Sequence, residues 1–198
     1  MTYITHKTFA VWWVTIANMF LWYKGIGEVN YYLAWIIMLY AGKSGALFPD
    51  VDHCWDSVKE KTMVNRVING VIHATGGKHR SWQTHSWDIA IVYSILAFTL
   101  PHQLIDQGIL SDVNGALLQQ LMIGFAVGWT SHLFSDMLTS AGVRLFCFKK
   151  KKLAFVPKQL FGFRFNTGNT WETFVYRVTK KLNIVVGFIG LVFPILYN

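Results

Sequence analysis

The chain has 198 residues, of which 53% are hydrophobic and only 14% are charged. This composition is too apolar and too poor in charge for an ordinary soluble domain, so it predicts an integral membrane protein. The net charge of +8 suits an anionic partner, either lipid or nucleic acid. The two cysteines, Cys54 and Cys147, are too few for a disulfide scaffold and are expected to be unpaired thiols.

Five apolar stretches approach the length of about 20 residues that a membrane-spanning helix needs. They are residues 8–23, 31–48, 89–105, 116–134 and 182–197. The residues before the first stretch lack the features of a cleaved signal peptide, so this stretch is expected to remain as an anchor. The first two stretches are short, and they could form a re-entrant pair. We therefore expect an all-α integral membrane protein, a bundle of four or five transmembrane helices that forms one domain over residues 1–198.

The basic residues fall almost entirely on one side of this expected bundle. The connections 1–7, 49–88 and 135–181 share that side and carry all Lys and Arg residues except Lys24 and Lys43. Because cytoplasmic loops are enriched in Lys and Arg, this side should face the cytoplasm of a bacterial inner membrane. The lysine run 149–152 and the phenylalanines around it then favour anionic lipid head groups as a partner, and no nucleic acid is expected.

An amphipathic helix is expected within the connection 49–88. Apolar residues recur at helical spacing from Met63 to Ile72, and polar residues such as Arg66 lie between them. This pattern is typical of a helix that lies on the membrane surface or on the bundle. The glycine pair at 76–77 should end it.

Histidines and aspartates gather on the same side as the basic residues, each close to the end of an apolar stretch. His132 and Asp136 are four residues apart, so on a helix they share one face. Histidine with aspartate is a ligand set for zinc, or for manganese or iron where carboxylates dominate. The sequence therefore predicts a site for one or two divalent ions, most readily zinc, at the cytoplasmic end of the bundle. Its candidate ligands are His6, Asp50, Asp52, His53, His79, His85, His132 and Asp136.

Each piece of this cluster also has a simpler interpretation. A histidine at a helix end often serves as a cap or an interfacial residue, and the PDVD run at 49–52 can start a helix. The segment 79–85 can be a positively charged anchor loop. His73 and His102 are expected to be structural. The common location of the eight candidates favours the metal site over these separate interpretations.

Four short motifs occur in order along most of the chain. They are Thr5-His6, LFPDVDH at 47–53, HRSWQTHS at 79–86, and SHLFSD at 131–136 followed by Gly142. In these motifs the sequence resembles the YdjM family of bacterial inner-membrane proteins, described as membrane-bound metal-dependent hydrolases. The stretch RFNTGNTWE at 164–172 is similar to a further element of that family. The resemblance implies a metal-dependent hydrolase built from membrane helices and leaves the substrate undefined.

The expected reaction is the hydrolysis of a phosphoester in a membrane lipid or a lipid-linked intermediate. A divalent ion makes its bound water acidic enough to supply hydroxide near neutral pH. Lys78 and Arg80, beside the histidines, are suited to bind the phosphate, and Arg80 also to assist the reaction. Either Asp52 or Glu172 is expected to position the water or to protonate the leaving group, and the sequence does not choose between them.

Two alternatives belong to other classes of protein. One is a non-enzymatic membrane protein in which a structural metal site holds loops that recruit a partner. The other is a metal transporter, which is less favoured because transport sites usually lie near the middle of the membrane. A structural metal site predicts loss of the fold when the metal is removed, whereas a catalytic site predicts loss of activity.

Overall fold

The computed structural model describes residues 1–26, 29–58, 61–157, 159–160, 163–164 and 168–197. Within these residues the α-helices are α1 (Tyr3–Tyr23), α2 (Tyr31–Gly45), α3 (Met63–Ala74), α4 (Trp87–Asp106), α5 (Asp112–Met137) and α6 (Thr170–Leu196). Two short 3-10 helices, η1 (Pro49–Asp52) and η2 (Trp55–Ser57), follow α2. Two antiparallel pairs lie between α5 and α6, β1 (Val143–Arg144) with β2 (Lys152–Leu153) and β3 (Gln159–Leu160) with β4 (Phe163–Arg164).

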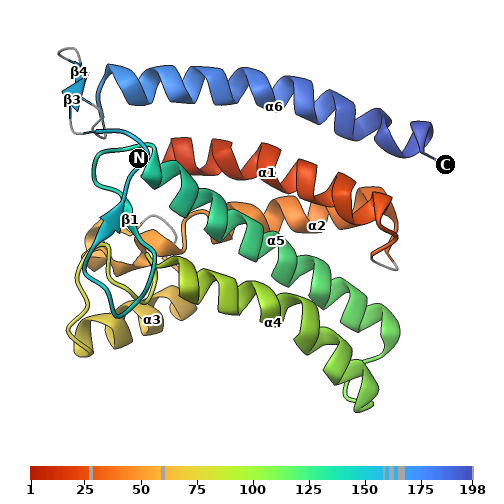
Figure 1. Ribbon diagram of the computed structural model, residues 1–198. Helices are drawn as coiled ribbons and strands as arrows, with labels where there is room; N and C mark the ends of the chain where they lie inside the picture. The colour runs from red at the N-terminus through yellow and green to blue at the C-terminus, as the bar shows by residue number, and fades with distance from the viewer. Residues whose placement is uncertain (27–28, 59–60, 158, 161–162, 165–167, 198) are drawn as a thin grey trace.

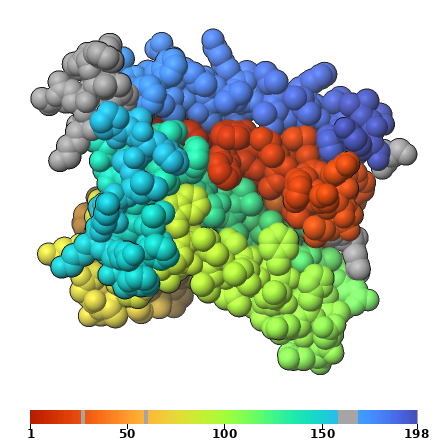
Figure 2. Space-filling view, in the orientation of Figure 1, coloured from red at the N-terminus to blue at the C-terminus, as the bar shows by residue number. Residues whose placement is uncertain are grey.

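Helix α5 is the centre of the bundle. It packs against α1, α2 and α4, and α6 lies along the outer side of α1 (Figure 1). The N-terminus, α3 and the strands gather at one end of the bundle, and the C-terminus lies at the other (Figure 1). The space-filling view shows the segment between α5 and α6 covering part of the first end (Figure 2).

Helices α2 and α5 touch through their backbones because glycine stands at the contact. A Cβ atom added to Gly128 would lie 2.0 Å from the carbonyl oxygen of Gly42, and one added to Gly45 would lie 2.1 Å from that of Phe125. Small residues that let two backbones approach are typical of helix pairs in membranes. This close contact places the last turn of α2 beside the second half of α5.

By length and apolar composition, α4 and α6 are the helices in the described part of the chain that could each cross a membrane. The expectation of four or five crossings therefore stays a prediction. Helix α2 has 15 residues, about 22 Å at 1.5 Å per residue, which is shorter than a hydrocarbon core of about 30 Å. Helix α5 is long enough but buries polar side chains, among them Gln119 and Gln120.

The connection expected over 135–181 is shorter in the structure and contains two short strand pairs. Helix α6 begins at Thr170 rather than near residue 182, because the Asn169 side chain caps it by accepting hydrogen bonds from the backbone N–H groups of Trp171 and Glu172. The first half of α6 contains basic residues, so it falls outside the apolar stretch 182–197 expected from the sequence. The strand pairs are too short to show an alternating pattern in the sequence, so they were not predicted. Their presence means that the fold is mostly, but not entirely, helical.

The expected amphipathic helix is present as α3, and the Thr62 side chain caps it by accepting a hydrogen bond from the N–H of Asn65. Ile72 packs with Val51 and Val58. Ile68 is partly buried beside them, whereas Met63, Val64, Val67 and Val71 are exposed. That this face lies against a membrane stays a prediction.

Candidate metal centre

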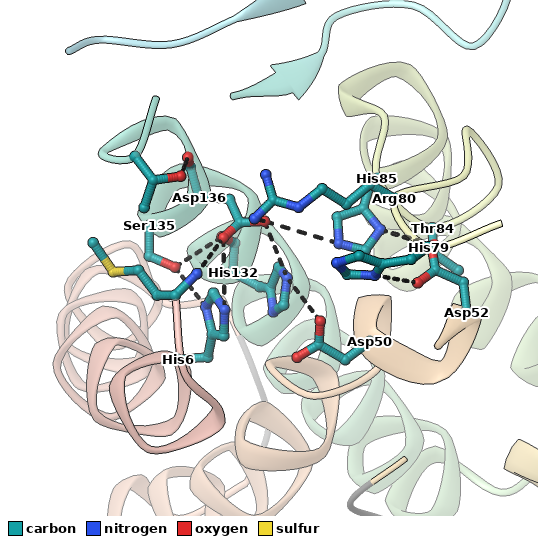
Figure 3. Close-up of polar contacts among 12 residues, drawn as sticks. His6, Asp50, Asp52, His79, Arg80, Thr84, His85, His132, Ser135 and Asp136 are labelled. Atoms are coloured by element: carbon teal, nitrogen blue, oxygen red, sulfur yellow. Dashed lines mark hydrogen bonds and ion pairs between the residues drawn. The ribbon is translucent and has the colours of Figure 1, made fainter. Parts of the chain in front are cut away.

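The predicted ligands come together at the end of the bundle that holds the N-terminus. Figure 3 shows them, apart from His53, at close range. They belong to the first turn of α1, the turn η1 with His53, the loop 79–86 and the last turns of α5. Among the described residues, three overlapping groups have ligand atoms within 4.8 Å of one another. The groups are His6, His132 and Asp136; Asp50, His85 and His132; and Asp50, His53 and His79. Seven of the eight predicted ligands fall in these groups, and Asp52 does not.

His132 is shared by two groups, and its ring is oriented by the neighbouring helix. Its Nδ1 lies 2.7 Å from the carbonyl oxygen of Ala46 at the end of α2. Since a carbonyl only accepts hydrogen bonds, Nδ1 carries the proton and Nε2 presents its lone pair to the cluster. That Nε2 lies 3.7 Å from Asp136 Oδ2 and 3.9 Å from Asp50 Oδ1. The close packing of α2 on α5 thus sets the orientation of a candidate ligand.

His6, together with His132 and Asp136, forms the helix-borne part of the cluster. Its ring stacks on that of His132 with centroids 3.6 Å apart. Its Nδ1 is hydrogen bonded to Ser135 Oγ at 2.6 Å, and its Nε2 lies 3.7 Å from Asp136 Oδ1. Helix α1 therefore contributes a ligand to the group that α5 begins.

Asp52 organises the loop 79–86 and is fully buried. Its carboxylate accepts hydrogen bonds from Ser81 N and Thr84 Oγ, both at 2.8 Å, from His85 Nδ1 at 3.0 Å and from His79 Nδ1 at 3.2 Å. Burial alone would raise the pKa of this carboxyl group, but the hydrogen bonds, first from His79 and His85, outweigh burial and hold the pKa well below its usual range. Asp52 therefore stays ionised and fixes two imidazole rings, an arrangement typical of residues that orient metal ligands.

Asp50, His53 and His79 form the turn-borne part of the cluster, which is more exposed. The rings of His53 and His79 stack with centroids 3.5 Å apart, and His53 Nε2 lies 3.7 Å from Asp50 Oδ1. Burial, followed by the neighbouring His79, lowers the pKa of His53, so its ring is neutral and able to bind a metal near neutral pH. Asp50 belongs to this group and to the group of His85 and His132, so it connects the two parts.

The unpartnered ring nitrogens test whether these residues suit a metal ion. The Nε2 atoms of His85 and His132 are buried and have no hydrogen-bond partner in the described part of the chain. Such atoms are costly to bury, because they lose water without gaining a bond. Two ligand atoms that are each about 2.1 Å from one zinc ion are at most about 4.2 Å apart. The separations of 3.7–3.9 Å among these nitrogens and the oxygens of Asp50 and Asp136 meet that limit. The residues therefore fit a divalent ion.

Two cations lie directly on Asp136. The Met1 amino group is 2.8 Å from its Oδ1, and Arg80 Nη2 is 3.0 Å from its Oδ2. Arg80 also donates from Nη1 to the carbonyl oxygen of Gly142 at 3.2 Å, and its backbone has a φ of 61°. A positive φ is unfavourable for a side-chain-bearing residue and is often found at functional sites. Arg80 thus orients Asp136 directly, a contact that the sequence did not indicate.

Two other predicted site residues lie apart from the three groups. Lys78 is exposed beside the loop. Glu172 is buried at the start of α6, where its carboxylate accepts hydrogen bonds from Thr2 N, Thr5 Oγ and Gly168 N. These contacts join the start of α1 to the start of α6. The catalytic role of Glu172 stays a prediction, and so does the role of Lys78 in binding.

Several groups that shape the site were not anticipated. Ser135, Ser81 and Thr84 stand inside the recognised motifs, so their position next to the candidate ligands was a usable signal. The carbonyl oxygens of Ala46 and Gly142 carried none, because any residue has a carbonyl. Cys54 and Cys147 are free thiols, as expected.

Fold and cluster together define a helical protein with a buried histidine and aspartate site at one end of its bundle. The chain belongs to the YdjM family of inner membrane proteins, whose family model matches residues 1–197. This confirms the family resemblance drawn from the motifs. The correspondence of the 164–172 element stays a prediction, and its positions 165–167 lie outside the described residues. A search of curated proteins found no significant match, and a search of solved structures found none either.

Proposed function

We propose that this chain is a membrane-bound, metal-dependent hydrolase that cleaves a phosphoester of a membrane lipid or of a lipid-linked substrate. The observation that carries the proposal is the pair of buried Nε2 atoms of His85 and His132. They lie near the carboxylates of Asp50 and Asp136 and have no hydrogen-bond partner among the described residues. Groups with this combination of burial, orientation and chemistry are suited to hold a divalent ion.

One or two ions suit the ligand set. The groups share His132 and Asp50, so ions in neighbouring groups would share ligands. Nitrogen from the five histidines of these groups favours zinc, and the carboxylates also allow manganese or iron. When bound, such an ion would supply Lewis acidity and a water of lowered pKa.

The protein's own residues would orient the substrate and the ligands. Asp52 accepts hydrogen bonds from four neighbouring residues, so we assign it the orientation of His79 and His85 rather than proton transfer. Asp50, whose side chain is 22% exposed, is the most accessible carboxylate of the cluster. Substrate would therefore approach from the side of Asp50 and the half-exposed His53 and His79.

The location of the site supports a substrate at the membrane surface. The chain belongs to an inner membrane family, and the cluster lies at the end of the bundle where the basic connections gather. By the enrichment of Lys and Arg in cytoplasmic loops, this end faces the cytoplasm. A phosphate group at the head of a lipid is then within reach of the cluster.

The test is an assay of purified protein in detergent with phosphatidic acid or phosphatidylglycerol in mixed micelles, with zinc or manganese added. We expect hydrolysis that stops on chelation and is lost in His132→Ala. The matched control is His102→Ala, which removes an exposed histidine whose Nε2 contacts Gln119 and should leave activity unchanged. Bound metal without hydrolysis, together with unfolding on chelation, would overturn the proposal in favour of a structural metal site.

A further inference from the structure

The hairpin β1–β2 is fixed over the end of α5 that carries Asp136. Its register pairs Val143 with Leu153 and Arg144 with Lys152. Just beyond it, Phe155 N donates to the carbonyl oxygen of Met137 at 2.7 Å. Val143 is buried in the core with Leu133 and Met137 of α5. The hairpin is therefore a packed part of the site end and not a free loop.

The same hairpin is bonded to the loop that carries His85. Arg144 N donates to the carbonyl oxygen of His85 at 3.4 Å, and Arg144 forms a bridge with Ser86. From the other side, the Arg80 guanidinium reaches the carbonyl oxygen of Gly142. The loop 79–86 and the hairpin β1–β2, which are far apart in sequence, are thus joined beside the candidate ligands His85 and Asp136.

This arrangement brings three cationic side chains together. Arg144 and Lys152 are paired across the strands, so their side chains leave the same face of the hairpin, opposite to the buried Val143. Arg80 contacts the hairpin at Gly142 and reaches Asp136. Desolvation, followed by the charges of Arg80 and Arg144, lowers the pKa of Lys152, and the carboxylates of Asp136 and Asp52 oppose this only in part. Like charges held side by side are unfavourable unless something compensates them.

One of these side chains also has an unmet hydrogen bond. Arg144 Nε is buried and has no hydrogen-bond partner in the described part of the chain. A buried N–H without an acceptor costs free energy, and the cost is larger on a charged group. An anion at this place would accept that hydrogen bond and offset the repulsion among the cations. Guanidinium groups suit phosphate in particular, because they can donate to two oxygens at once.

We propose that Arg144, Lys152 and Arg80 form a binding site for a phosphate group beside the histidine and aspartate cluster. The sequence placed Lys152 in a run expected to contact lipid head groups, and it did not place Lys152 or Arg144 beside the histidine and aspartate cluster. The phosphate site itself does not depend on the proposed hydrolase function. Only the identity of the molecule that carries the phosphate rests on that proposal. The shared chemistry is a phosphate oxyanion, whether free or at the head of a lipid.

The experiment measures binding of radiolabelled inorganic phosphate to the full chain in detergent by equilibrium dialysis, with metal added and after chelation. We expect saturable binding to the wild type, weakened about tenfold or more in Arg144→Gln and in Lys152→Gln, a loss of about 1.4 kcal/mol or more. Arg144→Lys should retain part of the affinity. The matched control is Lys150→Gln, which removes an exposed charge from the same loop and should bind as the wild type does.

A second arm distinguishes the source of the phosphate. The competitors are vesicles of phosphatidic acid, vesicles of phosphatidylcholine and unlabelled free phosphate. The site is assigned to a lipid phosphate if phosphatidic acid competes at a lower concentration than free phosphate does and phosphatidylcholine does not compete. Competition by free phosphate alone would assign it to a soluble one. Equal losses in Lys150→Gln and Lys152→Gln would mean general attraction to a basic loop and would overturn the proposal, as would an absence of saturable binding to the wild type. Because Lys152 is exposed, its variant decides the matter even if Arg144→Gln does not fold.

The two proposals can fail separately. Metal content is measured in every variant and should not change, since neither Arg144 nor Lys152 belongs to a ligand group. Phosphate binding that depends on these residues in a protein without bound metal would sink the hydrolase proposal and keep this one. Metal-dependent hydrolysis with phosphate binding unchanged in Arg144→Gln and Lys152→Gln would do the reverse.

Discussion

The cluster has a helix-borne part and a turn-borne part, and they are built differently. The helix-borne part consists of His6, His132 and Asp136, whose side chains are at most 2% exposed. The side chains of Asp50, His53 and His79, in the turn-borne part, are 22–42% exposed. Packed helices hold buried ligands in one geometry, whereas exposed ligands on turns have fewer contacts to restrain them. The first part is suited to hold an ion permanently, and the second to exchange ligands or admit substrate.

Helix α3 restrains the turn that carries Asp50 and His53. Asn69 donates from Nδ2 to the carbonyl oxygens of Val51 and His53, at 2.6 and 2.7 Å. His73 Nε2 lies 3.2 Å from the same carbonyl of His53. The amphipathic helix therefore supports the turn that carries Asp50 and His53, and its effect on the ligands is indirect.

The largest expected effect comes from removing the shared helix-borne ligand. His132→Ala takes a ligand from two groups, so we expect nearly all bound metal to be lost. His53→Ala should cost at most an ion held by Asp50, His53 and His79, the outer group. Elemental analysis of the purified proteins, with circular dichroism as a check of folding, gives the comparison. Equal metal loss in the two variants would show that the two parts do not differ as described.

A smaller effect is expected when the support of the loop ligands is weakened. Asp52→Asn keeps the shape of the side chain but not its charge, and residues that orient metal ligands typically contribute about 10- to 100-fold in affinity. We expect a loss in that range with the fold retained, measured by competition with a chelating dye. Unchanged affinity would remove Asp52 from the support of the site.

The contact between α2 and α5 offers a test from the fold. In Gly128→Ala the new Cβ would meet the backbone of Gly42, and overpacking of this kind costs about 1–3 kcal/mol. We expect a lower melting temperature and weaker metal binding, since Ala46 would move relative to His132. Gly187→Ala, where an added Cβ has open space, is the control. Helix propensity by itself would make both variants slightly more stable, because alanine is a better helix former than glycine. Gly128→Ala as stable as Gly187→Ala would therefore contradict the close contact.

The smallest effect should follow from Asn69→Ala, which removes two hydrogen bonds worth about 1 kcal/mol each. We expect the affinity for an ion held by Asp50, His53 and His79, the outer ion, to decrease a few fold. The affinity for an ion held by His6, His132 and Asp136, the inner ion, should not change. A titration of zinc into chelated protein resolves the two, and Val67→Ala on the exposed face of α3 serves as control. A weakened inner ion would contradict the separation of the two parts.

The sequence was informative wherever a motif put chemistry at the end of an apolar stretch. The spacing of His132 and Asp136, the PDVDH run and the THS triplet pointed to a common centre, and seven of eight candidates fall in groups with ligand geometry. The roles within the centre could not be read in the same way. Asp50 and Asp52 are two residues apart with the same side chain, yet Asp50 belongs to two ligand groups and Asp52 orients the rings of two histidines.

The sequence by itself determined the family, the helical character, the placement of α3 and the kinds of atoms at the site. These follow from composition, periodicity and short motifs, which are local properties of the chain. Only the tertiary structure decided which nitrogen of His132 faces the cluster, that Arg80 orients Asp136, and that Arg144 and Lys152 stand beside it. Each of these depends on a backbone carbonyl or a strand register supplied by a distant segment, and such contacts leave no pattern in the residues that make them.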